Sequence, residues 1–89
     1  MLFFPDAKTV RGRRQVRDLI EAKYEGYRTS VLFIIQRTDV EVLSPDDGVD
    51  PEFGDVLRLA VERGVEVYAY CSDFVGDKII LKKRVPVRL

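Results

Sequence analysis

The stretch that decides the fold is Ser30–Gln36, which reads SVLFIIQ. This unbroken run of β-branched, aromatic and aliphatic residues is typical of a strand buried on both faces, so we predict a central strand. Further along, Asp50-Pro51 is a helix N-cap followed by a favourable first helical residue, and Gly64 is a stop before a second apolar strand at Val65–Cys71. Strand, helix and strand in this order predict a right-handed crossover between parallel strands.

The flanking segments add a second helix and further strands. Thr9 is a good N-cap for a helix over Val10–Glu25, within which Gly12 allows close packing on a neighbour. Met1–Phe4 is a strand stub, and Lys78–Leu81 follows a turn at Asp73–Asp77 as an antiparallel partner of the preceding strand. The fold class predicted is therefore α/β, a small mixed sheet with two packed helices, in one domain over residues 1–89. The tail to Leu89 should be extended.

Composition excludes several classes of protein. The 89 residues are 46% hydrophobic and 34% charged, which is too apolar for a disordered tail. The longest apolar run, Val31–Ile35, is far shorter than the ~20 residues that span a bilayer, so we expect a cytoplasmic protein without a membrane partner. With no histidine and a single cysteine, Cys71, there is no internal disulfide, no Cys/His zinc cluster and no imidazole base. Cys71 is expected to be a packed thiol, and no cofactor or metal is predicted.

The net charge of zero conceals a segregation of charge along the chain. Residues 1–37 carry eight basic and four acidic side chains, residues 38–66 carry two and nine, and residues 67–89 carry five and two. A local field, and not the total charge, steers a polyanion towards a protein surface. Neutrality therefore does not exclude nucleic acid as a partner.

A basic cluster opens the first predicted helix, where the helix dipole already places positive charge. Such an arrangement is electrostatically awkward unless an anion such as phosphate neutralises it, and arginine favours bidentate phosphate contacts. The alternative is a solvated helix face with local ion pairs, Arg14 with Asp18 and Arg17 with Glu21. The candidate nucleic-acid-binding residues are Lys8, Arg11, Arg13, Arg14 and Arg17.

Weaker signals come from the strands and the central acidic stretch. Gln36 and Arg37 follow the predicted central strand at its carboxyl end, where open α/β sheets place ligands, and form a secondary candidate site. Tyr68 and Tyr70 alternate along a strand and should share one face, as core, interface or base-stacking platform. The acidic residues of Asp39–Asp55 do not have calcium-loop spacing and are interpreted as a solvated loop.

One stretch of the sequence matches the residue types and spacing of a metal-dependent nuclease motif, but we reject this match. Pro5-Asp6 is followed fourteen residues later by Glu21-Ala22-Lys23, but that chemistry needs the Glu and Lys to alternate along a strand. Here the two residues fall inside a helix, about 200° apart around its axis.

The chain nevertheless resembles the C-terminal segment of the sugar fermentation stimulation protein A family. The likeness covers nearly the whole chain in the right order and less than half of a typical member. The segments that carry it are Phe4–Ala7, Thr9–Gly12, Val31–Arg37 with Asp39, Val49–Phe53, Gly64–Val67 with Ala69-Tyr70, and Val85–Leu89.

The resemblance implies an OB-like domain joined to a domain similar to metal-dependent nucleases, in DNA-binding proteins linked to the regulation of sugar metabolism. The acidic residues and the Glu-x-Lys strand of the family lie upstream of Phe4–Ala7, so no catalytic carboxylate is carried over and this chain is expected to be non-catalytic. Thr9, Arg11 and Gly12 match the basic helix of the family, but Gln15 stands where a histidine is usual. The predicted function is DNA binding through phosphates. The alternative is a non-catalytic interaction module, or homo-oligomer, completed by a second chain.

Overall fold

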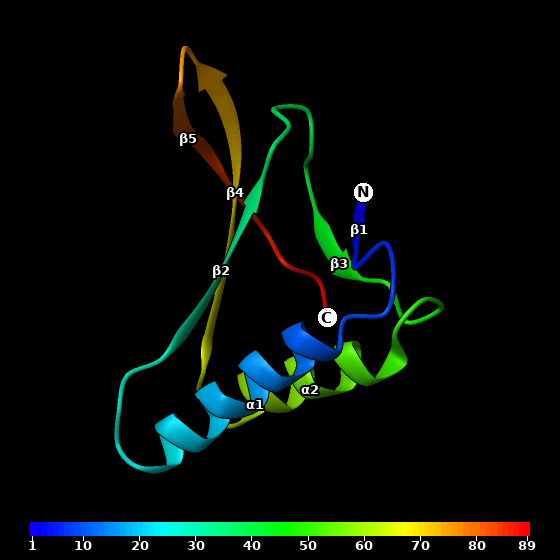
Figure 1. Cartoon of the computed structure of the whole chain (residues 1–89), viewed down its shortest axis with the longest axis vertical. Coiled ribbons are helices and arrows are strands. Elements are labelled where there is room, and N and C mark those ends of the chain that lie inside the picture. Colours follow the sequence, from blue (N-terminus) through cyan, green and yellow to red (C-terminus); the bar gives the residue numbers. More distant parts are fainter.

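The computed structural model describes residues 1–89 and contains two helices and five strands. Strands β2, β4 and β5 form one sheet, in which β2 and β4 are parallel and β4 and β5 antiparallel, while β1 and β3 form a separate parallel pair (Figure 1). The expected α/β class with a mixed sheet is confirmed. The elements are β1 (Leu2–Phe4), α1 (Val10–Tyr24), β2 (Ser30–Ile35), β3 (Leu43–Pro45), α2 (Pro51–Glu62), β4 (Glu66–Val75) and β5 (Lys78–Val85).

Both helices begin at the residues that their capping chemistry predicts. The Thr9 hydroxyl accepts a hydrogen bond from the Gly12 N–H at 3.0 Å, and the Asp50 carboxylate accepts one from the Phe53 N–H at 3.0 Å. After α2, Gly64 has a φ of 97°, a left-handed conformation that glycine adopts without strain. Neither helix has the length and apolar character that a membrane span requires.

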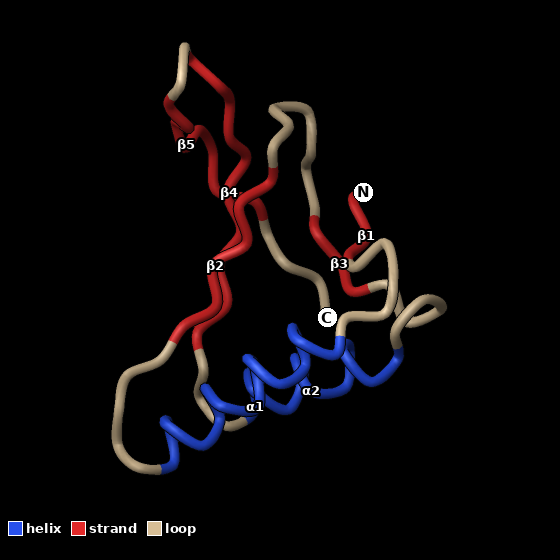
Figure 2. The backbone as a smooth tube through the Cα atoms, viewed as in Figure 1, coloured by secondary structure: helices blue, strands red, loops and turns tan.

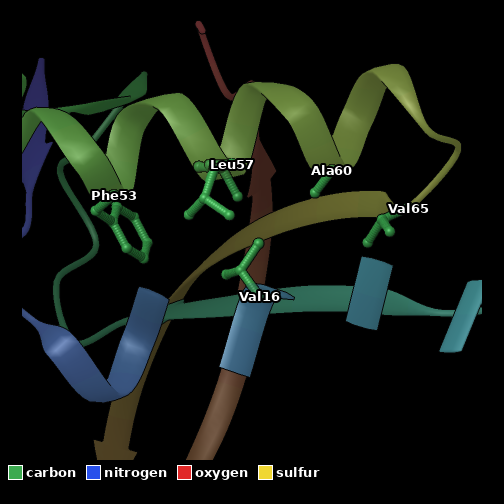
Figure 3. Close-up of a cluster of buried hydrophobic side chains, with 6 residues drawn as sticks. Val16, Phe53, Leu57, Ala60 and Val65 are labelled. Atoms are coloured by element: carbon green, nitrogen blue, oxygen red, sulfur yellow. The ribbon is translucent and has the colours of Figure 1, made fainter. Parts of the chain in front are cut away.

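The two helices lie next to each other on one side of the three-stranded sheet (Figure 2). Val16 of α1 points towards Phe53 and Leu57 of α2, and these side chains form a buried cluster with Val56, Ala60 and Val65 (Figure 3). A Cβ atom built on Gly12 would lie 3.3 Å from the Phe53 ring, which confirms the close approach that this glycine predicted. The helices are thus fixed by packing between them as well as against the sheet.

Phe33 of β2 joins this cluster to a second buried cluster under the other end of the sheet. Its ring makes edge-to-face contacts with the Phe4 ring, at a centroid distance of 5.4 Å, and with the Phe53 ring, at 6.5 Å. The three rings connect β1, β2 and α2, which belong to different sheets and layers. The second cluster consists of Ile35, Val40, Leu43, Ala69, Cys71 and Val85.

The prediction of a central strand at Ser30–Gln36 is wrong. β2 is an edge strand, because the sheet order is β2-β4-β5, and it is β4 that lies in the centre. The side chains of Leu32 and Ile34 are 49% and 48% exposed, whereas Phe33 and Ile35 pack into the core. An unbroken apolar run indicates that both faces avoid water, but within these 89 residues only one face has a partner.

Element lengths near the C-terminus also differ from the prediction. β4 continues past Cys71 to Val75, and β5 continues past Leu81 to Val85, so that a long hairpin turns at Gly76 instead of over the whole of Asp73–Asp77. Turn-forming residues in this segment face solvent on a two-stranded ribbon, where propensity has little influence. The acidic stretch Asp39–Asp55, interpreted as a solvated loop, contains a short strand, β3, because β1 pairs with Leu43–Pro45.

Candidate nucleic-acid interface

Three arginines of the basic cluster form a stripe on the outer surface of α1. Arg11, Arg14 and Arg17 are exposed and follow at intervals of three residues, so each step turns by about 60° and rises by about 4.5 Å. Arg14 lies about 160° around the helix from the buried Val16, which places the middle of the stripe opposite the core. Lys8 is exposed just before the helix begins. These four residues are named here the basic stripe.

No acidic side chain neutralises the basic stripe within 4.0 Å. The pairs that the alternative interpretation required, Arg14 with Asp18 and Arg17 with Glu21, are absent at this distance. α1 has no acidic residue in its first turn, so Lys8 and Arg11 meet the positive end of the helix dipole, while Arg14 and Arg17 lie further along the helix. The surface therefore carries a local positive field that an anion would relieve.

Arg13, the fifth residue of the predicted cluster, is engaged by its own chain. Its side chain is only 13% exposed, its Nε lies 3.4 Å from an Asp50 carboxylate oxygen, and its guanidinium donates a hydrogen bond to the Glu52 carboxylate. Since Asp50 and Glu52 belong to the start of α2, this arginine ties the beginnings of the two helices together. An anion would have to compete with both carboxylates for Arg13.

Asp50 is the buried centre of this junction between helices. Its side chain is 2% exposed, and one carboxylate oxygen accepts the Thr9 N–H at 2.8 Å while the other caps α2 through the Phe53 N–H. These backbone hydrogen bonds, of which that from Thr9 contributes most, and the positive charge of Arg13 hold the pKa of Asp50 below its usual value, although burial opposes them. Asp50 therefore neutralises the inner side of the α1 start and leaves the outer stripe unpaired.

The two residues of the secondary candidate site, at the end of β2, have different surroundings. Gln36 is exposed, whereas Arg37 makes a bidentate ion pair with Asp39 at 2.9 and 2.7 Å. The hydrogen bonds from Arg37 lower the pKa of Asp39. Both Gln36 and Arg37 line a groove of about 270 Å³ between β1 and β2. No ion pair joins them to the basic stripe, and Arg37 already has an anionic partner.

The tyrosines of β4 share one face of the sheet, as their alternation predicts. Tyr68 lies across from Leu32, and Tyr70 across from Ile34. Phe33 and Val67, at alternate positions of the two strands, pack against the helix cluster, so the tyrosines lie on the opposite face. The Tyr68 hydroxyl donates to the Glu66 carboxylate at 2.6 Å, and this hydrogen bond raises the pKa of Tyr68. Because the Arg84 guanidinium already lies 4.7 Å from the centre of its ring, Tyr68 is not a free surface for base stacking.

The remaining titratable residues do not form a metal centre. No group of three or more His, Cys, Asp or Glu side chains is placed to share an ion. Glu21 and Lys23 both lie in α1, as expected. The Cys71 thiol is buried and donates to the Val40 carbonyl oxygen at 3.4 Å, which is the packed thiol that the sequence indicates.

Comparison with known families identifies the fold and its relatives. The family model described as "Sugar fermentation stimulation protein RE domain" matches residues 1–78. The chain belongs to the sugar fermentation stimulation protein family. The resemblance drawn from the residue segments of the sequence is thereby confirmed, together with the fold class that it implied.

Relatives within the sugar fermentation stimulation protein family match nearly the whole chain. The homologue of Thermoanaerobacter sp. (strain X514) is 50% identical over 86 residues, which are 97% of this chain and 37% of that protein. The homologue of Geobacter metallireducens is 44% identical over the same shares of the two chains. This chain therefore spans little more than a third of the length of the curated relatives that it matches.

A solved structure from the same family has the same fold. Pyrococcus furiosus SfsA in complex with Ca²⁺ superposes with a TM-score of 0.88 at 30% identity, over 98% of this chain and 38% of that one. The residues of this chain do not fit a calcium site by themselves, because they provide no cluster of carboxylates.

The sequence indicated most of the positively charged residues of the candidate site, but it did not indicate which acidic side chains they would pair with. The ion pairs between Arg13 and the start of α2 join residues far apart in the chain, and no local spacing signals them. Sequence reasoning also missed Arg84, whose position over Tyr68 depends on the register of β4 and β5.

Proposed function

We propose that this chain binds nucleic acid, with DNA as the first candidate, through contacts of Lys8, Arg11, Arg14 and Arg17 with backbone phosphates. The observation that carries the proposal is the unpaired basic stripe on the outer face of α1, opposite the core. Membership of the sugar fermentation stimulation protein family supports this proposal, because the resemblance to that family implies DNA binding. Contacts with phosphates carry no direct sequence information, so binding through the stripe should be independent of sequence.

In this proposal residues 1–89 act as a single unit that carries part of a nuclease-like domain. The ring contacts of Phe33 with Phe4 and Phe53 support a single unit, because they join β1, β2 and α2. The chain is assigned a binding role and no catalytic step, as its carboxylates do not converge on a common point.

Removing the charge of the three stripe arginines is expected to weaken DNA binding at least tenfold. The variant is Arg11→Gln with Arg14→Gln and Arg17→Gln, measured by fluorescence anisotropy with a short duplex between about 50 and about 200 mM salt. Each lost phosphate contact should also reduce the salt slope by about one.

The matched control removes three exposed positive charges from the β5 strand, as Lys78→Gln with Lys82→Gln and Lys83→Gln. This variant has the same net charge as the arginine variant and should bind within threefold of the wild type. Equal losses in the two variants would show that only the total charge matters. An arginine variant that binds like the wild type would disprove the proposal.

A second candidate function, assembly with a second copy of the chain, is favoured by the free edge of β2. This strand has no charged residue, carries the exposed Leu32 and Ile34, and borders the groove between β1 and β2. By contrast, the opposite edge strand β5 carries Lys78, Lys82 and Lys83, a device that discourages strand pairing. An uncharged edge strand is the usual site for strand addition.

If β2 is the contact, light scattering should show a mass that rises with concentration towards twice 10.2 kDa. Ile34→Lys should then remain monomeric, because a charge on β2 opposes pairing. Ile79→Lys changes a side chain of similar exposure on β5 and should still associate. A wild-type chain that stays monomeric at all concentrations would exclude this function.

A further inference from the structure

A cleft of about 500 Å³ lies between β4 and the C-terminal tail. The cleft exists because the C-terminal tail, which follows β5 from Pro86, turns away from β4 before it has paired with the first residues of that strand. The β4–β5 ladder has its last pair at Ala69 and Val85, Pro86 has no N–H to continue it, and Val87 pairs with Leu43 of β3 instead. Figure 1 shows the tail, in red, running from β5 away from β4. As a result, Glu66–Tyr68 has a neighbouring strand only on the β2 side.

The open edge of β4 presents polar backbone groups to this cleft. The Glu66 N–H donates to the Thr29 carbonyl oxygen at 3.0 Å, on the side of β2. Because successive residues of a parallel strand direct their N–H and C=O groups to alternate sides, those of Val67 point away from β2 and towards the cleft. A ligand in the cleft can therefore receive a hydrogen bond from the backbone.

The side chains of the cleft combine apolar walls with one unpaired cation. Val61, Val65 and Val67 supply apolar surface, and Arg84 lies over the Tyr68 ring at its border. No carboxylate lies within 4.0 Å of the Arg84 guanidinium.

The acidic residue that lines the cleft is already neutralised. Glu66 receives a hydrogen bond from the Tyr68 hydroxyl and two more from Arg28, at 3.1 and 3.2 Å, which together lower the pKa of Glu66. In the 89-residue chain, Leu89 carries the terminal carboxylate, and its oxygen accepts a hydrogen bond from Arg58, which supplies a positive partner for that charge. The uncompensated side-chain charge of the cleft is thus that of Arg84.

We propose that this cleft binds a small monocarboxylate with an apolar body. The carboxylate pairs with the Arg84 guanidinium, which matches its planar geometry, and the apolar body lies against Val61, Val65 and Val67. The volume is within the range of small-molecule sites, about 300–1,000 Å³. No residue of α1 lines the cleft, so this site is independent of nucleic-acid binding by the basic stripe.

The test is a titration of the 15N-labelled 89-residue chain with phenylacetate, followed by NMR chemical shifts. We expect saturable shifts at Val67, Tyr68 and Arg84. Phenylacetamide, which has the same shape without the charge, should bind at least fivefold more weakly. This comparison uses the wild-type chain and does not depend on a variant.

A substitution then assigns the charge to one residue. Arg84→Gln should weaken phenylacetate binding at least fivefold, while Lys83→Gln, which removes a neighbouring exposed charge outside the cleft, should leave it unchanged. Equal binding of phenylacetate and phenylacetamide would overturn the proposal. So would shifts that centre on Arg11, Arg14 and Arg17 instead of on the cleft.

Discussion

Leu57→Ala is expected to lower the free energy of unfolding by about 2–5 kcal/mol. Leu57 is 2% exposed and lies in the cluster that holds α2 against α1, so its removal leaves a cavity that Phe53 and Val16 cannot fill without moving. A domain of this length has a total stability of about 4–13 kcal/mol. The variant should therefore lose a large part of its stability, and its Tm should fall by about 8 °C or more, at about 4–8 °C per kcal/mol.

Urea unfolding followed by circular dichroism measures this effect. Leu59→Ala is the matched control, because it is the same substitution on the same helix at a side chain that is 38% exposed. It should cost less than about 1 kcal/mol. If the two variants were equally destabilised, the interface between the helices would not be the main core of the protein.

Asp50→Asn is expected to lower the Tm at pH 7 by about 5–15 °C and to flatten the loss of stability in acid. Asparagine can still cap α2, but its single side-chain oxygen cannot serve both Phe53 and Thr9, and Arg13 loses its buried counter-ion. The variant thus separates the charge of this residue from its capping role.

The direction of the pH dependence follows from the lowered pKa of Asp50 in the folded state. Its stabilising effect is complete above the pKa of an unfolded aspartate, about 3.9, and is lost as the pH falls through the lower folded value. The wild type should therefore lose stability from about pH 5 downwards, and Asp50→Asn should lose less over the same range. Asp39 and Glu66, whose pKa values are also lowered, keep some acid sensitivity in the variant.

Thermal unfolding between pH 7 and pH 2 provides the measurement. Asp18→Asn, on the exposed surface of α1 and without an ion pair, should leave both the Tm and its pH profile unchanged. A profile for Asp50→Asn that runs parallel to that of the wild type would mean that the Asp50 charge contributes nothing to folding.

Local chemistry made the helices and the caps predictable. Thr9 and Asp50 cap because a side-chain oxygen reaches an N–H three residues along the same chain, an interaction that needs no distant partner. The apolar run of β2 likewise predicted a strand. The run did not reveal the position of that strand in the sheet, because the number of neighbours depends on segments elsewhere.

The candidate site divides in the same way. The stripe of Arg11, Arg14 and Arg17 follows from their spacing on a helix, and the sequence therefore predicted it as a group. The sequence did not predict that Arg13 pairs with Asp50 and Glu52. These ion pairs form only because α1 and α2 lie side by side.

The amino-acid sequence by itself determined the two helices with their caps, the strand-forming segments, the family, and the presence of a cationic helix start, because each depends on residues within a few positions of one another. Only the tertiary structure decided which cations stay unpaired, which strand lies at the edge, and where the tail leaves β4 to open a cleft. These features depend on contacts between residues that are distant in the chain and are brought together by packing.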